Sequence, residues 1–205
     1  NAKYTYNYTG NKVAVDNEEG VYAYGGMRLG GKGLLGFNLS NLEAPKPAFN
    51  NNISLINENT RGFGRIGHIW SQPSTARMKT SSSDTTGTDV LIFGGGYDLC
   101  YENENFQIGV AATADNGISA TCAAKTEADG NAVYIINAKT GELLWSATYD
   151  SGAMGNFDGK KYMKHSIVGG ITALDRNNDG YIDNLYFADL GGQVFRADFN
   201  GGIVG

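Results

Sequence analysis

The residues best suited to chemistry lie in one nine-residue stretch near the C-terminal end of the sequence, at 175–183. Oxygen donors recur there at every second position. Gly180 stands in sixth place, where a residue without a β-carbon lets the backbone turn sharply. This spacing matches the first nine positions of an EF-hand calcium loop. The predicted Ca²⁺ ligands are the side-chain oxygens of Asp175, Asn177 and Asp179, the backbone carbonyl of Tyr181, and the carboxylate of Asp183, bound directly or through water.

The segments on either side of this loop differ from those of an EF-hand. The twelfth position is Tyr186, so the bidentate glutamate of that motif is missing. Residues 166–174, 185–189 and 193–199 have strand character, so we expect strands where an EF-hand has helices. An acidic hairpin tip that is simply solvated is the alternative. Calcium is favoured because three carboxylates this close repel one another unless a cation neutralises them.

The composition limits the class of protein. The chain has 205 residues and a net charge of −5, and its sixteen Lys and Arg residues are scattered along the sequence. Binding to phosphate backbones needs clustered positive charge, so no nucleic acid is expected as a partner. No apolar run reaches the length of a bilayer span, so no membrane span is expected. Both ends resemble cuts through a larger polypeptide.

Two cysteines, Cys100 and Cys122, are the disulfide candidates. In a secreted protein they would pair and close the loop between them, which stabilises the fold by about 3 kcal/mol through loop entropy. In a cytosolic protein they would be two free thiols. Their spacing fits no zinc motif, and both histidines stand far away in the sequence.

The apolar runs and turn residues predict an all-β fold. Thirty glycines and frequent aromatic residues favour short strands joined by tight turns, and no segment has the periodicity of an amphipathic helix. The expected strands are 21–24, 33–39, 69–78, 90–94, 133–137, 143–147, 171–174, 185–189 and 193–199. Such a series is typical of a sandwich, a barrel or a propeller.

Internal similarity favours the β-propeller. Residues 33–39, 131–138 and 192–199 each run from a small residue through an apolar strand to an Asn or Asp that begins a turn. About ten strands make only two or three four-stranded blades, too few to close a ring. We therefore expect residues 1–205 to form part of a single propeller domain of a larger chain. Residues 100–130 are expected to be a surface insertion, and the Asn-rich residues 45–60 are also expected at the surface.

No arrangement of residues predicts catalysis. Gly31, Gly33 and Gly36 have the spacing of a dinucleotide-binding loop, but the residues that follow predict a strand where that site needs a helix. The sequence also lacks the Gly-x-Ser-x-Gly motif of serine hydrolases. We therefore expect a protein without enzyme activity and without catalytic residues.

Residues 132–145 resemble the blade repeat of quinoprotein-type propellers. Asn137 can cap the turn with its side chain, Gly141 can supply a left-handed residue, and Trp145 can pack between blades. The adjacent cysteine pair of the quinone enzymes is absent, because Cys100 and Cys122 lie apart.

Four segments together resemble the C-terminal propeller of the PilC/PilY family of type IV pilus tip proteins. They are 69–77 with its Ser-x-Pro run, the glycine-rich 90–98, the repeat at 130–145, and 171–199 with the acidic loop and a following Ala-Asp-Leu-Gly-Gly run. The similarity covers residues 67–199.

This resemblance implies a location at the pilus tip on the bacterial surface, reached through the periplasm or outer membrane during assembly. It implies minor pilins and the pilus tip complex as partners, and contacts with host or abiotic surfaces. The implied function is to support pilus assembly, oppose retraction and contribute to adhesion or surface sensing, with calcium in the loop regulating the balance. The metal ligands carried over are the same five residues that the spacing predicts.

Two alternatives remain open from the sequence. One is a fragment of a quinoprotein-like dehydrogenase that uses calcium to hold a quinone. The other is a purely structural propeller that serves as a scaffold in the cell envelope.

Overall fold

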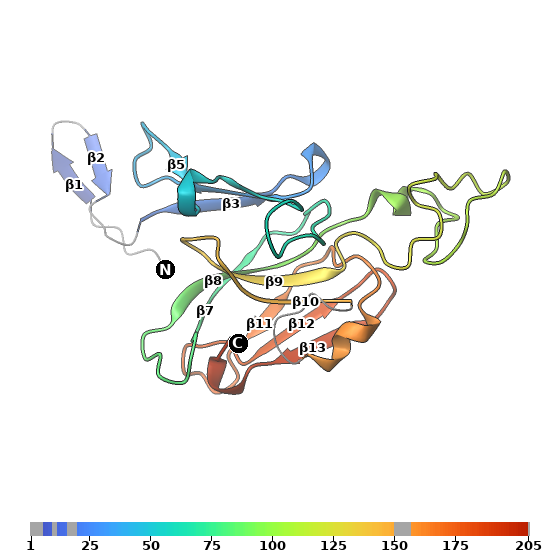
Figure 1. Cartoon of the computed structure of the whole chain (residues 1–205). Helices are drawn as coiled ribbons and strands as arrows, with labels where there is room; N and C mark the ends of the chain where they lie inside the picture. Colours follow the sequence, from blue (N-terminus) through green and yellow to red (C-terminus); the bar gives the residue numbers. More distant parts are fainter. Residues whose placement is uncertain (1–5, 10–11, 16–19, 150–156, 205) are drawn as a thin grey trace.

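The computed structural model describes residues 6–9, 12–15, 20–149 and 157–204; the ends of the domain predicted over 1–205 lie outside these ranges. In the part described, every strand pairing within the sheets is antiparallel and every helix is a short 3₁₀ turn (Figure 1). The all-β prediction is therefore confirmed. Short strands suit this sequence because β-branched and aromatic runs alternate with glycine-rich turns.

Three sheets make up the body of the molecule, and a separate hairpin joins β1 (Tyr6–Thr9) to β2 (Lys12–Val15). The first sheet contains β3 (Tyr22–Gly26), β4 (Leu34–Asn38) and β5 (Lys46–Pro47), and β6 (Leu55–Ile56) also pairs with β4. The central sheet has the order β10 (Leu143–Thr148), β9 (Ala132–Asn137), β8 (Thr88–Gly94), β7 (Ser74–Met78). The third sheet is β11 (Thr172–Leu174), β12 (Asn184–Ala188), β13 (Val194–Asp198). The 3₁₀ turns are η1 (Arg28–Gly30), η2 (Asn50–Asn52), η3 (Leu99–Glu102), η4 (Asp158–Tyr162) and η5 (Asn200–Gly202).

The central sheet is buried on both faces because its neighbours cover one face each. Successive side chains of a strand point to opposite faces, so Ile135 of β9 packs toward the third sheet and Tyr134 toward the first. Both side chains are at most 1% exposed. Burial of one such side chain contributes about 1.5–3 kcal/mol, which explains why β8 and β9 have continuous apolar sequences.

The expected strands agree with the structure except at their ends and in two segments. The strand predicted over 69–78 is wrong in its first half, since only Ser74–Met78 is a strand. The segment 166–174 likewise contributes only Thr172–Leu174. The Asn-rich residues 45–60 are not a simple surface insertion, because β5 and β6 pair with β4 and Phe49 and Ile56 lie in the core.

The three similar sequence segments become equivalent strands. They are β4, β9 and β13, and each pairs with the strand before it. At the end of that preceding strand, a later segment crosses closely. A β-carbon built on Gly26 would lie 2.2 Å from the Ile69 carbonyl oxygen, and one on Gly94 would lie 2.4 Å from that of Ile167. Glycine is required at both crossings. The first and central sheets therefore share one arrangement, an antiparallel strand pair whose first strand ends where a later segment crosses it.

Residues 100–130, which we call the arm, connect β8 to β9 and extend away from the sheets in Figure 1. The arm contains no strand and one 3₁₀ turn at its start. None of the three sheets closes on itself within the described ranges. In the same part of the chain, no helix has the length and apolarity of a membrane span.

Candidate calcium loop

The acidic loop, residues 175–183, joins β11 to β12 in the third sheet. Leu174 and Asn184 are register partners, so the loop is the tip of a β-hairpin and strands stand on both sides of it, as predicted. The backbone turns through Asn178, with a φ of 61°, and Gly180, with a φ of 91°. Both values lie in the left-handed region, which glycine and asparagine tolerate best.

The predicted ligand side chains bond to one another and to the loop backbone. Asp175 accepts hydrogen bonds from the N–H groups of Asp179 and Gly180, at 3.2 and 2.7 Å. The side-chain N–H of Asn177 donates to Asp179 Oδ2 at 3.1 Å. Asp183 Oδ2 accepts from the backbone N–H of Asn177 at 3.3 Å, which brings the two ends of the loop together. These bonds hold the acidic side chains within a single turn of chain.

The donor set fits calcium in its chemistry, because it consists of oxygen ligands with three carboxylates. Across the described ranges, however, no three His, Cys, Asp or Glu side chains are grouped so as to hold a metal ion. The carboxylates bonded to loop N–H groups would have to turn toward a common centre to share an ion. The calcium site therefore stays a prediction.

The loop is docked against the central sheet through residues that follow its glycine. The Tyr181 hydroxyl donates to the Thr85 carbonyl at 3.2 Å, and Lys79 Nζ lies 4.3 Å from the centre of the Tyr181 ring. The N–H of Ile182 donates to the Arg77 carbonyl at 3.1 Å. The position of the loop is thus set by the connection between β7 and β8, in another sheet.

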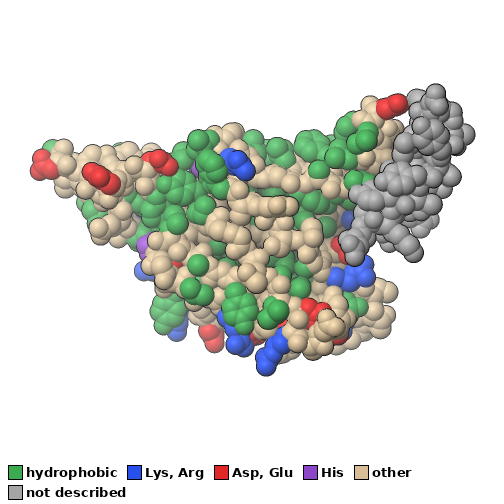
Figure 2. All heavy atoms as spheres, turned by 180° about the vertical axis from the view of Figure 1, so that it is seen from behind, with side chains coloured by type: hydrophobic (Ala, Val, Ile, Leu, Met, Phe, Trp, Pro, Cys, Tyr) green, Lys and Arg blue, Asp and Glu red, His purple; other side chains and the backbone are tan. Residues whose placement is uncertain are grey.

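A pocket of about 420 Å³ lies beside the loop, between it and the last residues of the chain. Arg176 and Asp183 of the loop line it together with Arg196 and Asp198 of β13. The hydrogen bond from Arg196 holds the pKa of Asp198 below its ordinary value, and the charge of Arg176 acts in the same direction. Figure 2 shows basic and acidic side chains side by side along the lower side of the molecule. Two guanidinium groups and two carboxylates therefore face one pocket beside the acidic loop.

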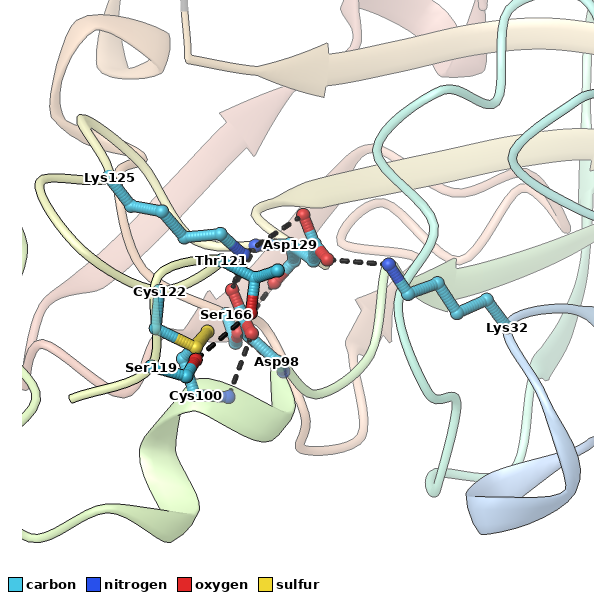
Figure 3. Close-up of a disulfide and its surroundings, with 9 residues drawn as sticks. All are labelled: Lys32, Asp98, Cys100, Ser119, Thr121, Cys122, Lys125, Asp129 and Ser166. Carbon is cyan, nitrogen blue, oxygen red and sulfur yellow. Dashed lines mark hydrogen bonds and ion pairs between the residues drawn. A yellow bond between two sulfur atoms is a disulfide. The ribbon is translucent and has the colours of Figure 1, made fainter. Parts of the chain in front are cut away.

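Cys100 and Cys122 form a disulfide at the base of the arm, with their Cα atoms 5.6 Å apart (Figure 3). The bond closes a loop across 22 residues. Asp98 lies two residues before Cys100, and its carboxylate accepts a hydrogen bond from the Cys100 N–H at 2.9 Å. The free-thiol alternative does not hold in this structure, since neither cysteine is free.

An ion-pair cluster, formed by residues far apart in the sequence, fixes both ends of the arm (Figure 3). Lys125 Nζ lies 2.6 Å from Asp98 Oδ2 and 3.5 Å from Asp129 Oδ1, and Lys32 Nζ lies 2.6 Å from Asp129 Oδ2. Ser166 bridges the two aspartates by accepting from the Asp98 N–H and donating to the Asp129 carbonyl. Only the spacing of Lys125 and Asp129, four residues apart, could have suggested part of this cluster.

Three comparisons with known proteins bear on this chain. No family model matches it. A curated protein of Xylella fastidiosa, described as a type IV pilus biogenesis factor PilY1 homolog, is 23% identical over 175 residues, which are 84% of this chain and 10% of that protein. The crystal structure of the Pseudomonas aeruginosa PilY1 C-terminal domain matches with a TM-score of 0.54 and 18% identity.

The structural match covers 95% of this chain and 29% of the crystallised chain. At that identity the likeness shows a shared fold. This chain spans about a tenth of the length of the curated relative.

Proposed function

Because this chain is PilY1-like in sequence and in fold, we propose that it forms part of a type IV pilus biogenesis protein. Its place is the cell surface and the pilus tip, and its partners are minor pilins and other components of the tip. It supports pilus assembly, opposes retraction and contributes to contact with surfaces. The role is one of binding and assembly, without an enzymatic step.

The observation that carries the calcium part of this proposal is the docked acidic loop. Its five ligand residues, Asp175, Asn177, Asp179, Tyr181 and Asp183, lie within one nine-residue stretch, and the side chain of Tyr181 contacts the connection between β7 and β8. Bound Ca²⁺ supplies the positive charge that three clustered carboxylates otherwise lack. The loop then becomes more rigid, and the connection that it contacts becomes more rigid with it.

The architecture proposed for the whole domain is a β-propeller with quinoprotein-like blades. The three stacked antiparallel sheets, each with an equivalent strand pair, correspond to successive blades. The remaining blades belong to the longer protein. A structure of the full-length protein would test this, and a sandwich with the three sheets at its centre would contradict it.

Isothermal titration calorimetry tests the calcium site directly. We expect a Kd on the order of 10⁻⁵ to 10⁻³ M, in the weaker range because the twelfth-position glutamate is missing. Asp175→Ala should abolish binding while the circular dichroism of the strands is retained. Asp115→Asn, in the exposed arm, is the matched control and should bind as the wild type does. No binding heat at millimolar calcium would overturn this part of the proposal.

The pilus role is tested in cells whose full-length protein carries Asp179→Ala. We expect a changed number of surface pili, counted by electron microscopy in calcium-containing medium, at an unchanged level of the protein. An unchanged number, with calcium binding lost in the purified variant, would make calcium purely structural and favour the scaffold alternative.

A further inference from the structure

A groove separates the first sheet from the edge strand β7 of the central sheet. By strand alternation, Asp89 shares the face of the central sheet that carries Leu91, and Arg77 is its register partner on the edge strand β7. Leu91 is fully covered by the first sheet, whereas the side chains of Arg77 and Asp89 remain 53% and 50% exposed. The first sheet therefore stops short of the edge, and a groove of about 450 Å³ remains, with Tyr22 and Tyr24 on its other wall.

The aromatic wall of the groove is rigid. Tyr22 and Tyr24 lie on the same face of β3, with their ring planes 6° apart and their centroids 6.3 Å apart. The Tyr24 ring also stacks on Phe49 at 6.1 Å, and its hydroxyl donates to the Ala138 carbonyl. A tyrosine hydroxyl is protonated at physiological pH, and burial raises the pKa of Tyr24 further, so the hydroxyl can donate to Ala138. Tyr24 is thus held through its ring and its hydroxyl, and Tyr22, stacked on Tyr24, presents an aromatic ring to the groove.

The opposite wall is polar and keeps unused hydrogen-bonding capacity. Arg77 donates from two nitrogens to a single oxygen of Asp89, Oδ1, at 3.2 Å each. Both hydrogen bonds end on Oδ1, so within the described residues Asp89 Oδ2 can accept a hydrogen bond from a ligand. Lys139 lines one end of the groove and is exposed.

A pyranose sugar matches these two walls. One face of its ring carries C–H groups, which pack on aromatic rings, and its edge carries hydroxyl groups, which bond to a carboxylate and a guanidinium. Sites for small ligands commonly combine such aromatic walls with a few fixed polar groups. We propose that the groove between Tyr22, Tyr24 and the Arg77–Asp89 pair binds a pyranose residue of a surface glycan.

The charges of the groove favour an acidic sugar over a neutral one. Arg77 and Lys139 together outnumber Asp89, so a carboxylate on the sugar gains an ion pair. The groove would supply the chemical basis of the surface contacts proposed above, so this inference rests on the proposed function. Its test uses purified protein without pili and without calcium, so the two proposals can fail separately.

Saturation-transfer NMR with methyl glucoside and methyl glucuronide tests the groove. We expect transfer to the ring C–H protons of both sugars at concentrations on the order of 10 mM, with tighter binding of the glucuronide. Tyr22→Ala should weaken binding about fivefold or more, while Tyr22→Phe, which keeps the ring, should bind normally. Tyr162→Ala, an exposed tyrosine of η4 away from the groove, is the matched control.

A second variant tests the groove without changing Tyr22, so the result does not depend on whether Tyr22→Ala folds. Arg77→Gln changes an exposed side chain of the edge strand and should remove the preference for the glucuronide. The inference is overturned if the wild type shows no transfer to either sugar. It is equally overturned if folded Tyr22→Ala and Arg77→Gln both bind as the wild type does.

Discussion

Tyr181 serves the acidic loop through two different groups. Its backbone carbonyl is a predicted calcium ligand, while its side chain contacts Thr85 and Lys79 in the connection between β7 and β8. A side-chain substitution therefore leaves the ligand in place and removes only the docking contact. This separates the effect of loop position from the effect of ligand chemistry.

We predict that Tyr181→Ala lowers calcium affinity about fivefold, because one hydrogen bond and one cation–π contact worth about 1 kcal/mol no longer hold the loop. Titration calorimetry measures this. Tyr181→Phe, which loses only the hydroxyl, should show a smaller change. Equal affinities in all three proteins would mean that docking does not influence the loop.

Asp129 is the residue whose charge state links the arm to the first sheet. Desolvation on burial would raise the pKa of Asp129, but the hydrogen bond from Lys32 and the charges of Lys125 and Lys32 outweigh it. The pKa in the folded protein is therefore lowered. A lowered pKa adds stability that is present above the unfolded pKa of about 3.9 and is lost as the pH falls through the folded value.

Asp129→Asn should therefore be less stable than the wild type at neutral pH, and the difference should shrink as the pH falls below about 3.9. Denaturant unfolding at a series of pH values measures it. The exposed arm residue Asp115 supplies the control, since Asp115→Asn should match the wild type throughout. A constant difference between Asp129→Asn and the wild type at all pH values would contradict the ion-pair explanation.

At the scale of elements, the arm is held at its base by the disulfide and by the ion pairs of Asp98 and Asp129 (Figure 3). Its distal residues between the two cysteines have no strand partners. The disulfide therefore restrains the distal part, and the ion pairs restrain the base.

Replacement of both cysteines by serine should release the distal arm first, with a loss of up to about 3 kcal/mol from the closed loop. Limited proteolysis followed by mass spectrometry should find new cleavage sites between residues 101 and 121 while the sheets stay intact. Cleavage that begins in the central sheet would show that the disulfide stabilises the core instead.

The strands that could be predicted were those with long apolar runs. β8 and β9 are buried on both faces and leave a continuous signal, whereas β5 and β6 have two residues each and leave none. A strand was predicted from residue 69, but β7 begins only at Ser74. Ile69 is apolar because it packs across the end of β3, and not because it lies in a strand. Packing between elements is not visible in a single stretch of sequence.

The acidic loop was predictable because its oxygen-bearing side chains fall within one nine-residue stretch. Its docking through Tyr181 and the pairing of Lys32 with Asp129 join residues far apart in the sequence, which local spacing cannot reveal. The resemblance to the PilC/PilY family is confirmed by the PilY1-like sequence and fold.

At the scale of the whole molecule, the sheets are joined where a later segment crosses the end of an earlier strand. The Gly26 crossing leaves no room for a β-carbon, while the neighbouring Gly25 has nothing within 4 Å of that position. The two glycines lie in the same strand and differ in this one respect, so they form a matched pair.

Gly26→Ala should destabilise the protein by about 1–3 kcal/mol, because the Ile69 backbone must move away. Gly25→Ala should be neutral or slightly stabilising, since alanine in an open strand position reduces the entropy of the unfolded chain. Thermal unfolding of the two variants compares them. Equal melting temperatures would mean that the first sheet tolerates a shift against the central one.

The connection that carries the arm leaves the central sheet after Gly94 and returns to it beside Val133, and these two residues are register partners in adjacent strands. Its two ends are therefore as close as those of a tight turn, whatever its length. Each doubling of such a segment costs only about 0.6 kcal/mol in closure entropy. Exposed residues of the arm away from Asp98, Lys125 and Asp129 can consequently be lengthened or exchanged at little cost to the sheets, and a foreign epitope or reporter could be grafted there for the same reason.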